Sequence, residues 1–262
     1  MKRVLFLMAA AIMAVTLVAC GAPATQQMDA ATSAPATEAP TPEPTLEPTR
    51  EPVVVFTDAV LEGLVRTAMN KPTGDIMLTE AEAVTELNLQ MEGGVPIPRV
   101  ADVSDLTQFP NLTALNLNWA LADDGVEGES MDISPLAGLT KLEVLYICCD
   151  DISDISVLAG MTNMKELWIW GNNSISDISA LAGMTQMESL WIKGNQITDI
   201  SALAGMKNLS RLYMEGNQVT DITPLVGLTK LTSLKLADNP VEDLSPLADI
   251  YPNLTEKDFE LN

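Results

Sequence analysis

The sequence reads MKELWIWGNNSISDISALAGMTQ at residues 164–186, MESLWIKGNQITDISALAGMKN at 187–208 and LSRLYMEGNQVTDITPLVGLTK at 209–230. These three segments are successive copies of one pattern. The first apolar residue of each copy recurs along the chain, at intervals of 30, 22, 23, 22, 22 and 23 residues, as Leu112, Leu142, Met164, Met187, Leu209, Leu231 and Leu254. One such unit cannot bury its apolar residues alone, so the copies must stack into a solenoid.

The copies share the pattern L-x-x-L-x-L-x-x-N, which resembles the leucine-rich repeat. The continuation N-x-I-x-D-I-S-x-L is similar to the 22-residue repeat of internalin-like bacterial surface proteins. This resemblance covers about residues 53–262 and implies an α/β solenoid of about seven repeats. The expected fold is a right-handed arc with a parallel sheet on its concave side, an irregular or 3-10 convex side and a helical N-terminal cap.

Each repeat is predicted to contain one short strand, whose alternate side chains point to opposite faces of the sheet. The inward positions are expected to be Leu145, Ile147, Leu167, Ile169, Leu190, Ile192, Leu212, Met214, Leu234 and Leu236. Apolar residues after the turn, namely Ile152, Ile175, Ile197, Val219 and Val241, are expected to fill the core. Leu158, Leu181, Leu203, Leu225 and Leu247 are expected to close it from the convex side.

Two polar columns recur with the repeats. Asn172, Asn195, Asn217 and Asn239 follow the strands, three of them after the turn glycines Gly171, Gly194 and Gly216. Their amides are expected to bind backbone groups where the chain leaves the strand. Asp154, Asp177, Asp199, Asp221 and Asp243 form the second column, where stacked carboxylates would suit calcium but more simply accept hydrogen bonds from local amides.

The ends of the solenoid need caps, because a terminal repeat would expose its core. Residues 57–69 have helical apolar spacing, and a second short helix is expected to begin at Thr79 with a capping box over residues 79–82. We assign residues 53–83 to the cap and 84–262 to the repeats. A last edge strand is expected over residues 254–261, blunted by its charges.

The N-terminus indicates export. Residues 1–19 combine Lys2 and Arg3 with an apolar run that is short for a membrane span, which is typical of a signal peptide. The segment Leu17-Val18-Ala19-Cys20 resembles the bacterial lipobox, which implies acylation of Cys20 and anchoring outside the cytoplasm. The rest of residues 20–52 is rich in Pro, Thr and Glu and is predicted to be an extended stalk.

The composition excludes several functions. The formal net charge of −22 repels nucleic acid and anionic lipid headgroups, so neither is an expected partner. The absence of His rules out Ser-His and Cys-His triads and His-ligated zinc sites. We therefore predict a monomeric binding protein, with no enzymatic activity, catalytic residue, metal ion or cofactor.

Two repeats are lengthened, by insertions at about residues 91–102 and 119–131. Both insertions follow a predicted strand, so they are expected to lie side by side. The second contains the acidic residues Asp123, Asp124, Glu127 and Glu129, and Asp132 follows directly after it. A solvated acidic loop is the simpler interpretation, and a calcium loop is the alternative, since hard cations take several oxygen ligands.

The outward column of the strands carries the candidate site. Along the repeats it reads Asn88, Asn116, Tyr146, Trp168, Trp191, Tyr213, Lys235 and Asp258, with Trp170 on the same face. Lys193, Arg211, Glu166 and Glu215 surround the aromatic residues. We predict that Tyr146, Trp168, Trp170, Trp191, Tyr213, Lys193 and Arg211 bind a ligand. The competing interpretation is that aromatic residues merely favour strands and pack across them.

Cys148 is expected to face the concave surface and Cys149 the turn, where the pair is either a vicinal disulfide or two small turn residues. The sequence leaves three functions open for the whole chain. The first is protein–protein interaction or adhesion at the aromatic concave face of a lipid-anchored cell-surface protein, and the second is binding of cell-wall glycan there. The third, an acidic hydrolase, is disfavoured because the carboxylates fall in repeat columns or loops. The sequence has no immunoglobulin-like domain after the repeats and no sorting motif, so host-cell invasion is not expected.

Overall fold

The computed structural model describes residues 51–91, 99–121, 131–148 and 152–261. Contacts divide the chain into two units, Met1–Pro48 and Thr49–Asn262, and all the described residues belong to the second. In this described part, no helix has the length and apolar character needed to cross a membrane. The predicted signal peptide and Cys20 lie outside the described residues, and the assigned domain limits stay predictions.

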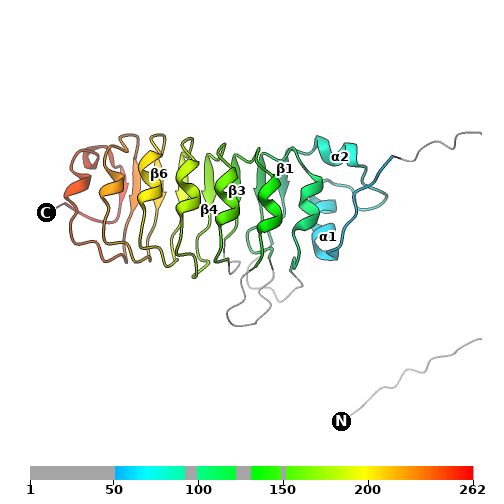
Figure 1. Ribbon diagram of the computed structural model, residues 1–262, viewed down its shortest axis with the longest axis horizontal. Helices are drawn as coiled ribbons and strands as arrows, with labels where there is room; N and C mark the ends of the chain where they lie inside the picture. The colour runs from blue at the N-terminus through cyan, green and yellow to red at the C-terminus, as the bar shows by residue number, and fades with distance from the viewer. Residues whose placement is uncertain (1–50, 92–98, 122–130, 149–151, 262) are drawn as a thin grey trace, which may run out of the picture. The chain divides into compact units, whose positions relative to one another are not determined.

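The described unit is built around one parallel sheet of eight strands, in the order of the chain (Figure 1). The strands are β1 Glu86–Asn88, β2 Ala114–Asn116, β3 Val144–Tyr146, β4 Glu166–Trp168, β5 Ser189–Trp191, β6 Arg211–Tyr213, β7 Ser233–Lys235 and β8 Glu256–Lys257. Each strand pairs only with the strands of the adjacent repeats, as expected for a solenoid.

Short 3-10 helices form the layer opposite the sheet (Figure 1). They are η1 Ser104–Gln108, η2 Ser134–Gly138, η3 Ser156–Gly160, η4 Ser179–Gly183, η5 Ser201–Gly205, η6 Thr223–Leu225, η7 Ser245–Leu247 and η8 Tyr251–Asn253. The predicted core lies between the two layers. In the repeat of β5, for example, Leu190, Ile192, Ile197 and Leu203 are all fully buried. Val241 is the exception among the predicted core residues, since it is only half-buried.

The asparagine column is the main polar component of this core. Asn172 is fully buried and Asn195 and Asn217 are 6% exposed. The side-chain amide of Asn217 donates to the carbonyls of Ile192 and Met214, at 3.0 and 2.9 Å, and its oxygen accepts the Ile197 N–H at 3.1 Å. Each side chain therefore links the backbones of neighbouring repeats, which confirms its predicted role.

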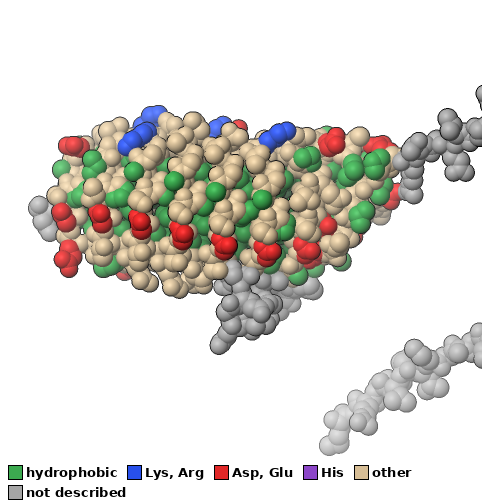
Figure 2. Space-filling view, viewed as in Figure 1, with side chains coloured by type: hydrophobic (Ala, Val, Ile, Leu, Met, Phe, Trp, Pro, Cys, Tyr) green, Lys and Arg blue, Asp and Glu red, His purple; other side chains and the backbone are tan. Residues whose placement is uncertain are grey.

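The carboxylates of the aspartate column bind the first backbone N–H of each of the helices η1 to η7 from the residue before the N-cap, and we call this contact a cap. Each carboxylate accepts the backbone N–H two residues ahead, at 2.7 to 2.8 Å, in Asp102, Asp132, Asp154, Asp177, Asp199, Asp221 and Asp243. Figure 2 shows acidic side chains in a row across the face that carries these helices. The structural interpretation of this column is confirmed. Asp132 belongs to it, so its placement with the acidic loop was wrong.

These caps predict a pH dependence of stability. Hydrogen bonds from the Ser or Thr two residues ahead, either from its backbone N–H or from its hydroxyl, hold the pKa below its usual value in Asp132, Asp154, Asp177, Asp221 and Asp243. A carboxylate with a lowered folded-state pKa stabilises the fold above its unfolded-state pKa, and that stabilisation is lost as pH falls through the folded-state pKa.

We therefore expect the urea midpoint to be flat from pH 7 to 5 and to fall below about pH 4. A variant with Asp154→Asn, Asp177→Asn and Asp221→Asn keeps side-chain caps that do not titrate, because asparagine also accepts at this position. Its midpoint should depend less on pH over the same range. If the urea midpoint fell equally at low pH in the wild type and the variant, the aspartate caps would not be the cause of the pH dependence.

The N-terminal cap contains two helices. Helix α1, Ala59–Ala68, buries Leu61 and Val65, and the Asp58 carboxylate accepts the N–H of Val60 and Leu61 at 2.8 and 2.9 Å. The other oxygen of Asp58 accepts the N–H of Ala101 at 2.7 Å, which ties the cap to the first repeat.

The start predicted for the second helix was wrong. Helix α2 covers Leu78–Ala83, and Glu80 accepts the N–H of Met77 at 2.8 Å, so Met77 rather than Thr79 is the N-cap. The Thr79 hydroxyl instead donates to Glu51, 28 residues earlier in the chain.

The C-terminal edge strand is shorter than predicted. Strand β8 contains only Glu256 and Lys257. The following residue, Asp258, uses its carboxylate to accept the N–H of Leu236 and Ala237 at 2.8 and 3.1 Å. Backbone pairing therefore ends before this position, and Asp258 does not extend the paired column as predicted.

The two insertions are described only at their ends. Val100 and Leu121 form a parallel bridge, with the Val100 N–H donating to the Ala120 carbonyl at 2.8 Å. These ends of the two insertions are therefore adjacent. Asp123, Asp124, Glu127 and Glu129 lie outside the described residues, so the calcium and acidic-loop interpretations stay untested.

Candidate functional site

Four aromatic rings lie in one row on the open face of the sheet, which is the face that points away from the 3-10 helices. The strand register aligns Tyr146, Trp168, Trp191 and Tyr213 across β3 to β6. Their ring centroids are 4.3, 4.5 and 4.4 Å apart in that order, and the first two pairs are stacked, with interplanar angles of 30° and 22°. We call these four residues the aromatic ladder.

The strands position the ladder through simple alternation. In each of β3 to β6, the residue before the ring is a fully buried leucine, such as Leu167 before Trp168, so the ring must point to the open face. The rings stand on the last residue of each strand, and all four are half-buried. Stacking thus covers part of the area that the sequence suggested would be exposed.

Polar groups hold the two ends of the ladder. The Tyr213 hydroxyl donates to Glu256 at 2.7 Å, and Lys235 lies 3.4 Å from the same carboxylate. Burial and then the nearby Glu166 carboxylate raise the pKa of Tyr146 to about 12. Burial, and then the hydrogen bond to Glu256, also raise the pKa of Tyr213, so both tyrosines remain protonated donors at neutral pH.

Trp170 and Lys193 extend the open face beside the ladder. The Lys193 ammonium lies 4.8 Å from the centre of the Trp170 ring, a cation–π contact. The indole nitrogens of Trp168 and Trp170 are buried donors with no acceptor among the described residues, whereas that of Trp191 donates to Ser189 at 3.2 Å. Arg211 is exposed at the start of β6. The binding role of these residues stays a prediction.

Cys148 was placed wrongly by the sequence pattern. It is fully buried rather than on the open face, and its N–H donates to the side-chain oxygen of Asn118 at 3.1 Å. Strand β3 ends at Tyr146, so strand alternation does not determine where Cys148 points. Cys149 lies outside the described residues, and the question of a vicinal disulfide is untested.

A hollow of about 270 Å³ adjoins the ladder on the open face of β1 to β3. We call it the N-terminal hollow; its lining residues are Glu86, Leu87, Asn88, Ala114, Leu115, Asn116, Val144 and Tyr146. Sequence reasoning missed it, although the signal was present: the outward column changes from two asparagines to a tyrosine at β3. A small side chain beside a large one leaves a space with one aromatic wall.

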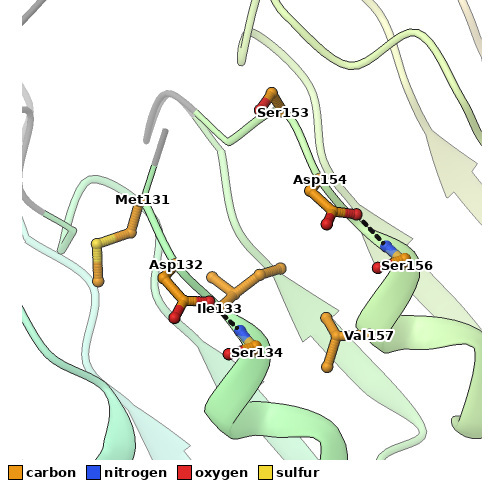
Figure 3. A pocket seen from close by; sticks show the side chains of 8 residues that line it. All are labelled: Met131, Asp132, Ile133, Ser134, Ser153, Asp154, Ser156 and Val157. Carbon is orange, nitrogen blue, oxygen red and sulfur yellow. Dashed lines mark hydrogen bonds between the residues drawn. The ribbon is translucent and has the colours of Figure 1, made fainter. Parts of the chain in front are cut away.

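A second hollow, of about 200 Å³, lies on the opposite face between the starts of η2 and η3. Figure 3 shows Asp132 and Asp154 there, each bonded to its own serine, Ser134 or Ser156. These carboxylates are used as helix caps and do not converge on one point. Across the described residues, no group of three or more His, Cys, Asp or Glu side chains could hold a metal ion.

The comparisons with known proteins agree with this geometry. The family described as Leucine Rich repeats (2 copies) matches residues 140–183, 185–227 and 207–249. The chain folds as a leucine-rich-repeat solenoid. Among solved structures, it is similar to an internalin (inlF) of Listeria monocytogenes, with 36% identity and a TM-score of 0.67 over 79% of this chain. The match spans 58% of that internalin, so this chain corresponds to only part of its length.

Two further solved structures are similar. Internalin C2 of Listeria monocytogenes shares 26% identity, with a TM-score of 0.59, over 81% of this chain and 99% of that one. A leucine-rich-repeat protein of Leptospira interrogans shares the fold at 19% identity, with a TM-score of 0.54, over 69% of this chain and 44% of that one. A comparison with curated proteins finds no match. The likeness to internalins is therefore one of repeat type and fold.

Proposed function

We propose that this leucine-rich-repeat protein binds another protein through the aromatic ladder, as an adhesion or interaction protein. The observation that carries the proposal is the ladder itself: four large rings in register on an otherwise open face. A few residues supply most of the binding energy in protein interfaces, and large aromatic side chains are enriched among them because they bury much area with few rotatable bonds. Solenoids also present extended sheet faces that suit such contacts.

The unpaired indole donors support the same proposal. The nitrogens of Trp168 and Trp170 are buried without an acceptor among the described residues. An unpaired buried donor costs about 1–3 kcal/mol. A carbonyl oxygen from a bound protein, reaching these groups after a small movement of the covering side chains, would remove that cost.

Stacking within the ladder weighs against glycan as the main ligand. Sugars bind aromatic residues by lying on a ring face, but the faces of Trp168 are covered by Tyr146 on one side and Trp191 on the other. The ladder therefore presents mainly ring edges, which suit the mixed contacts of a protein surface better than the flat face of a sugar. Catalysis is not proposed, because the repeating aspartates serve as helix caps.

We further propose that the protein acts on the outer surface of a bacterial cell. The lipobox-like segment ending in Cys20 supports lipid anchoring, and the Pro-rich stalk supports a position away from the membrane. The similarity to internalins supports a surface-binding role but names no partner.

The proposal is tested by a quantitative pull-down from cell-surface protein extracts, run beside a glycan array. The baits are the wild-type protein, Trp168→Ala/Trp191→Ala and the control Val226→Ala, which removes an apolar side chain that is 48% exposed and outside the ladder. A protein captured by wild type and control but lost from the double variant is expected. Equal capture by all three baits would mean that the ladder only stabilises the sheet. Glycan binding that is lost from the double variant would mean that the ligand is a sugar and not a protein.

A further inference from the structure

The N-terminal hollow is small and open to solvent. Its volume of about 270 Å³ is below the range of about 300–1,000 Å³ that is typical of small-molecule sites. It opens on the same face as the aromatic ladder and shares Tyr146 with it. A segment bound along the ladder would therefore reach the hollow with its next side chain.

One wall of the hollow is an aromatic ring face. Tyr146 stacks on Trp168 through one face, at 4.3 Å. Its other face turns toward β2, where the paired residue is Asn116, a much shorter side chain. Tyr146 is thus an end member of the ladder, and it keeps one ring face for a ligand.

The polar groups of the hollow favour a cation. The amide of Asn116 is used internally, because it donates to Gln90 at 3.1 Å and accepts the Asn118 N–H at 3.0 Å. The Asn88 oxygen accepts the Gln90 N–H at 3.3 Å. The charged lining residue is the exposed Glu86, and the eight lining residues include no Lys or Arg.

We propose that the N-terminal hollow receives an arginine side chain of the protein partner, stacked on Tyr146 and paired with Glu86. A guanidinium is planar, stacks on aromatic faces and donates in a fork that matches a carboxylate. The net charge of −22 attracts basic partners in addition. A sugar could also lie on the ring face, but the Asn116 amide is already bonded within the protein and offers sugar hydroxyls few partners. This inference rests on the proposed function and adds the chemistry of one anchor residue.

The test is an NMR titration of the full-length protein with the peptide acetyl-Gly-Arg-Gly-amide. The controls are the same peptide with citrulline, which keeps the shape and loses the charge, and a methyl glucopyranoside. We expect the arginine peptide to bind at least about fivefold more tightly than the citrulline peptide, consistent with one cation–π contact and one exposed ion pair.

Matched variants locate the binding. Glu86→Gln and Tyr146→Leu should each weaken arginine-peptide binding by about threefold or more. Tyr146→Phe keeps the ring face and should recover the binding that Tyr146→Leu loses. Glu242→Gln removes an equal charge from an exposed residue between β7 and η7, so it should bind as wild type. Equal binding of citrulline, an equal loss in Glu242→Gln, or binding of the glycoside in place of arginine would overturn the proposal.

The two proposals fail in different ways. If Trp168→Ala/Trp191→Ala loses the captured protein while Glu86→Gln keeps full affinity for it, the ladder stands and the arginine anchor is wrong. If the double variant keeps the captured protein, the ladder is wrong whatever the peptide does. Loss of that protein in both variants, with the peptide selectivity above, supports both.

Discussion

Replacing Trp168 and Trp191 together by alanine is expected to weaken binding of the captured protein by at least about 100-fold. The two rings occupy the centre of the aromatic ladder, stacked on each other at 4.5 Å. Truncating a central aromatic anchor costs about 2–4 kcal/mol of binding free energy. Because the two rings contact each other, the double variant should lose less than the sum of the two single losses. A loss near 3 kcal/mol corresponds to about 100-fold in Kd.

Binding isotherms of wild type, both single variants and the double variant measure this effect, with Val226→Ala as the control. Each single variant should lose at least about tenfold and the control less than about twofold. Far-UV circular dichroism of every variant separates loss of contact from loss of fold. A double variant that is folded and binds within threefold of wild type would remove the ladder from the interface.

Replacing Asn217 by alanine is expected to lower the free energy of unfolding by about 3 kcal/mol. The change leaves the Ile197 N–H without its acceptor and removes donors from the carbonyls of Ile192 and Met214, all inside the core. Water cannot replace these partners, because Asn217 is only 6% exposed. Each buried group left unpaired costs about 1–3 kcal/mol, with partial relaxation reducing the total.

The matched control is Asn208→Ala. Asn208 also joins neighbouring repeats, donating to the Thr185 carbonyl at 3.2 Å and accepting from Lys230 at 2.7 Å, but it is only half-buried. Water can replace these hydrogen bonds, so Asn208→Ala should lower the free energy of unfolding by less than about 1 kcal/mol. Urea unfolding compares the two variants, and an equal cost would mean that the buried column does not specially stabilise the stack.

The repeat made most of the fold predictable from sequence. With a period of 22 or 23 residues and one strand per repeat, residues at equal positions must face each other across parallel strands. The column from Asn88 to Lys235 is therefore paired as predicted. The buried leucines and both polar columns follow from the same argument.

The errors came from contacts that the repeat does not contain. The start of α2 depends on Glu80 accepting the Met77 N–H, while Thr79 bonds to the distant Glu51. The length of β8 depends on the Asp258 carboxylate replacing a backbone partner of Leu236. The two ends of the solenoid do not repeat, so no equivalent segment of the chain indicates their structure. Their helix and strand limits were therefore predicted from local sequence patterns alone.

The candidate site was predictable as a list of residues but not as a surface. The sequence puts the rings in one column, yet their stacking, their half-burial and the unpaired indole nitrogen of Trp168 depend on side-chain torsions. The N-terminal hollow depends on a comparison of neighbouring strands, from Asn116 to Tyr146. Cys148 shows the limit of alternation, which ends with a strand of three residues.

Hydroxyl-radical footprinting of the complex tests the central claim most directly, because it reads which aromatic side chains a partner covers. Trp168, Trp191 and Tyr213 should lose most of their modification on binding. Tyr251 and Phe259, an aromatic pair with centroids 6.2 Å apart and outside the ladder, should be modified equally in the free and bound protein. Unchanged modification of the ladder in a saturated complex, with protection elsewhere, would contradict binding through the open face of the sheet.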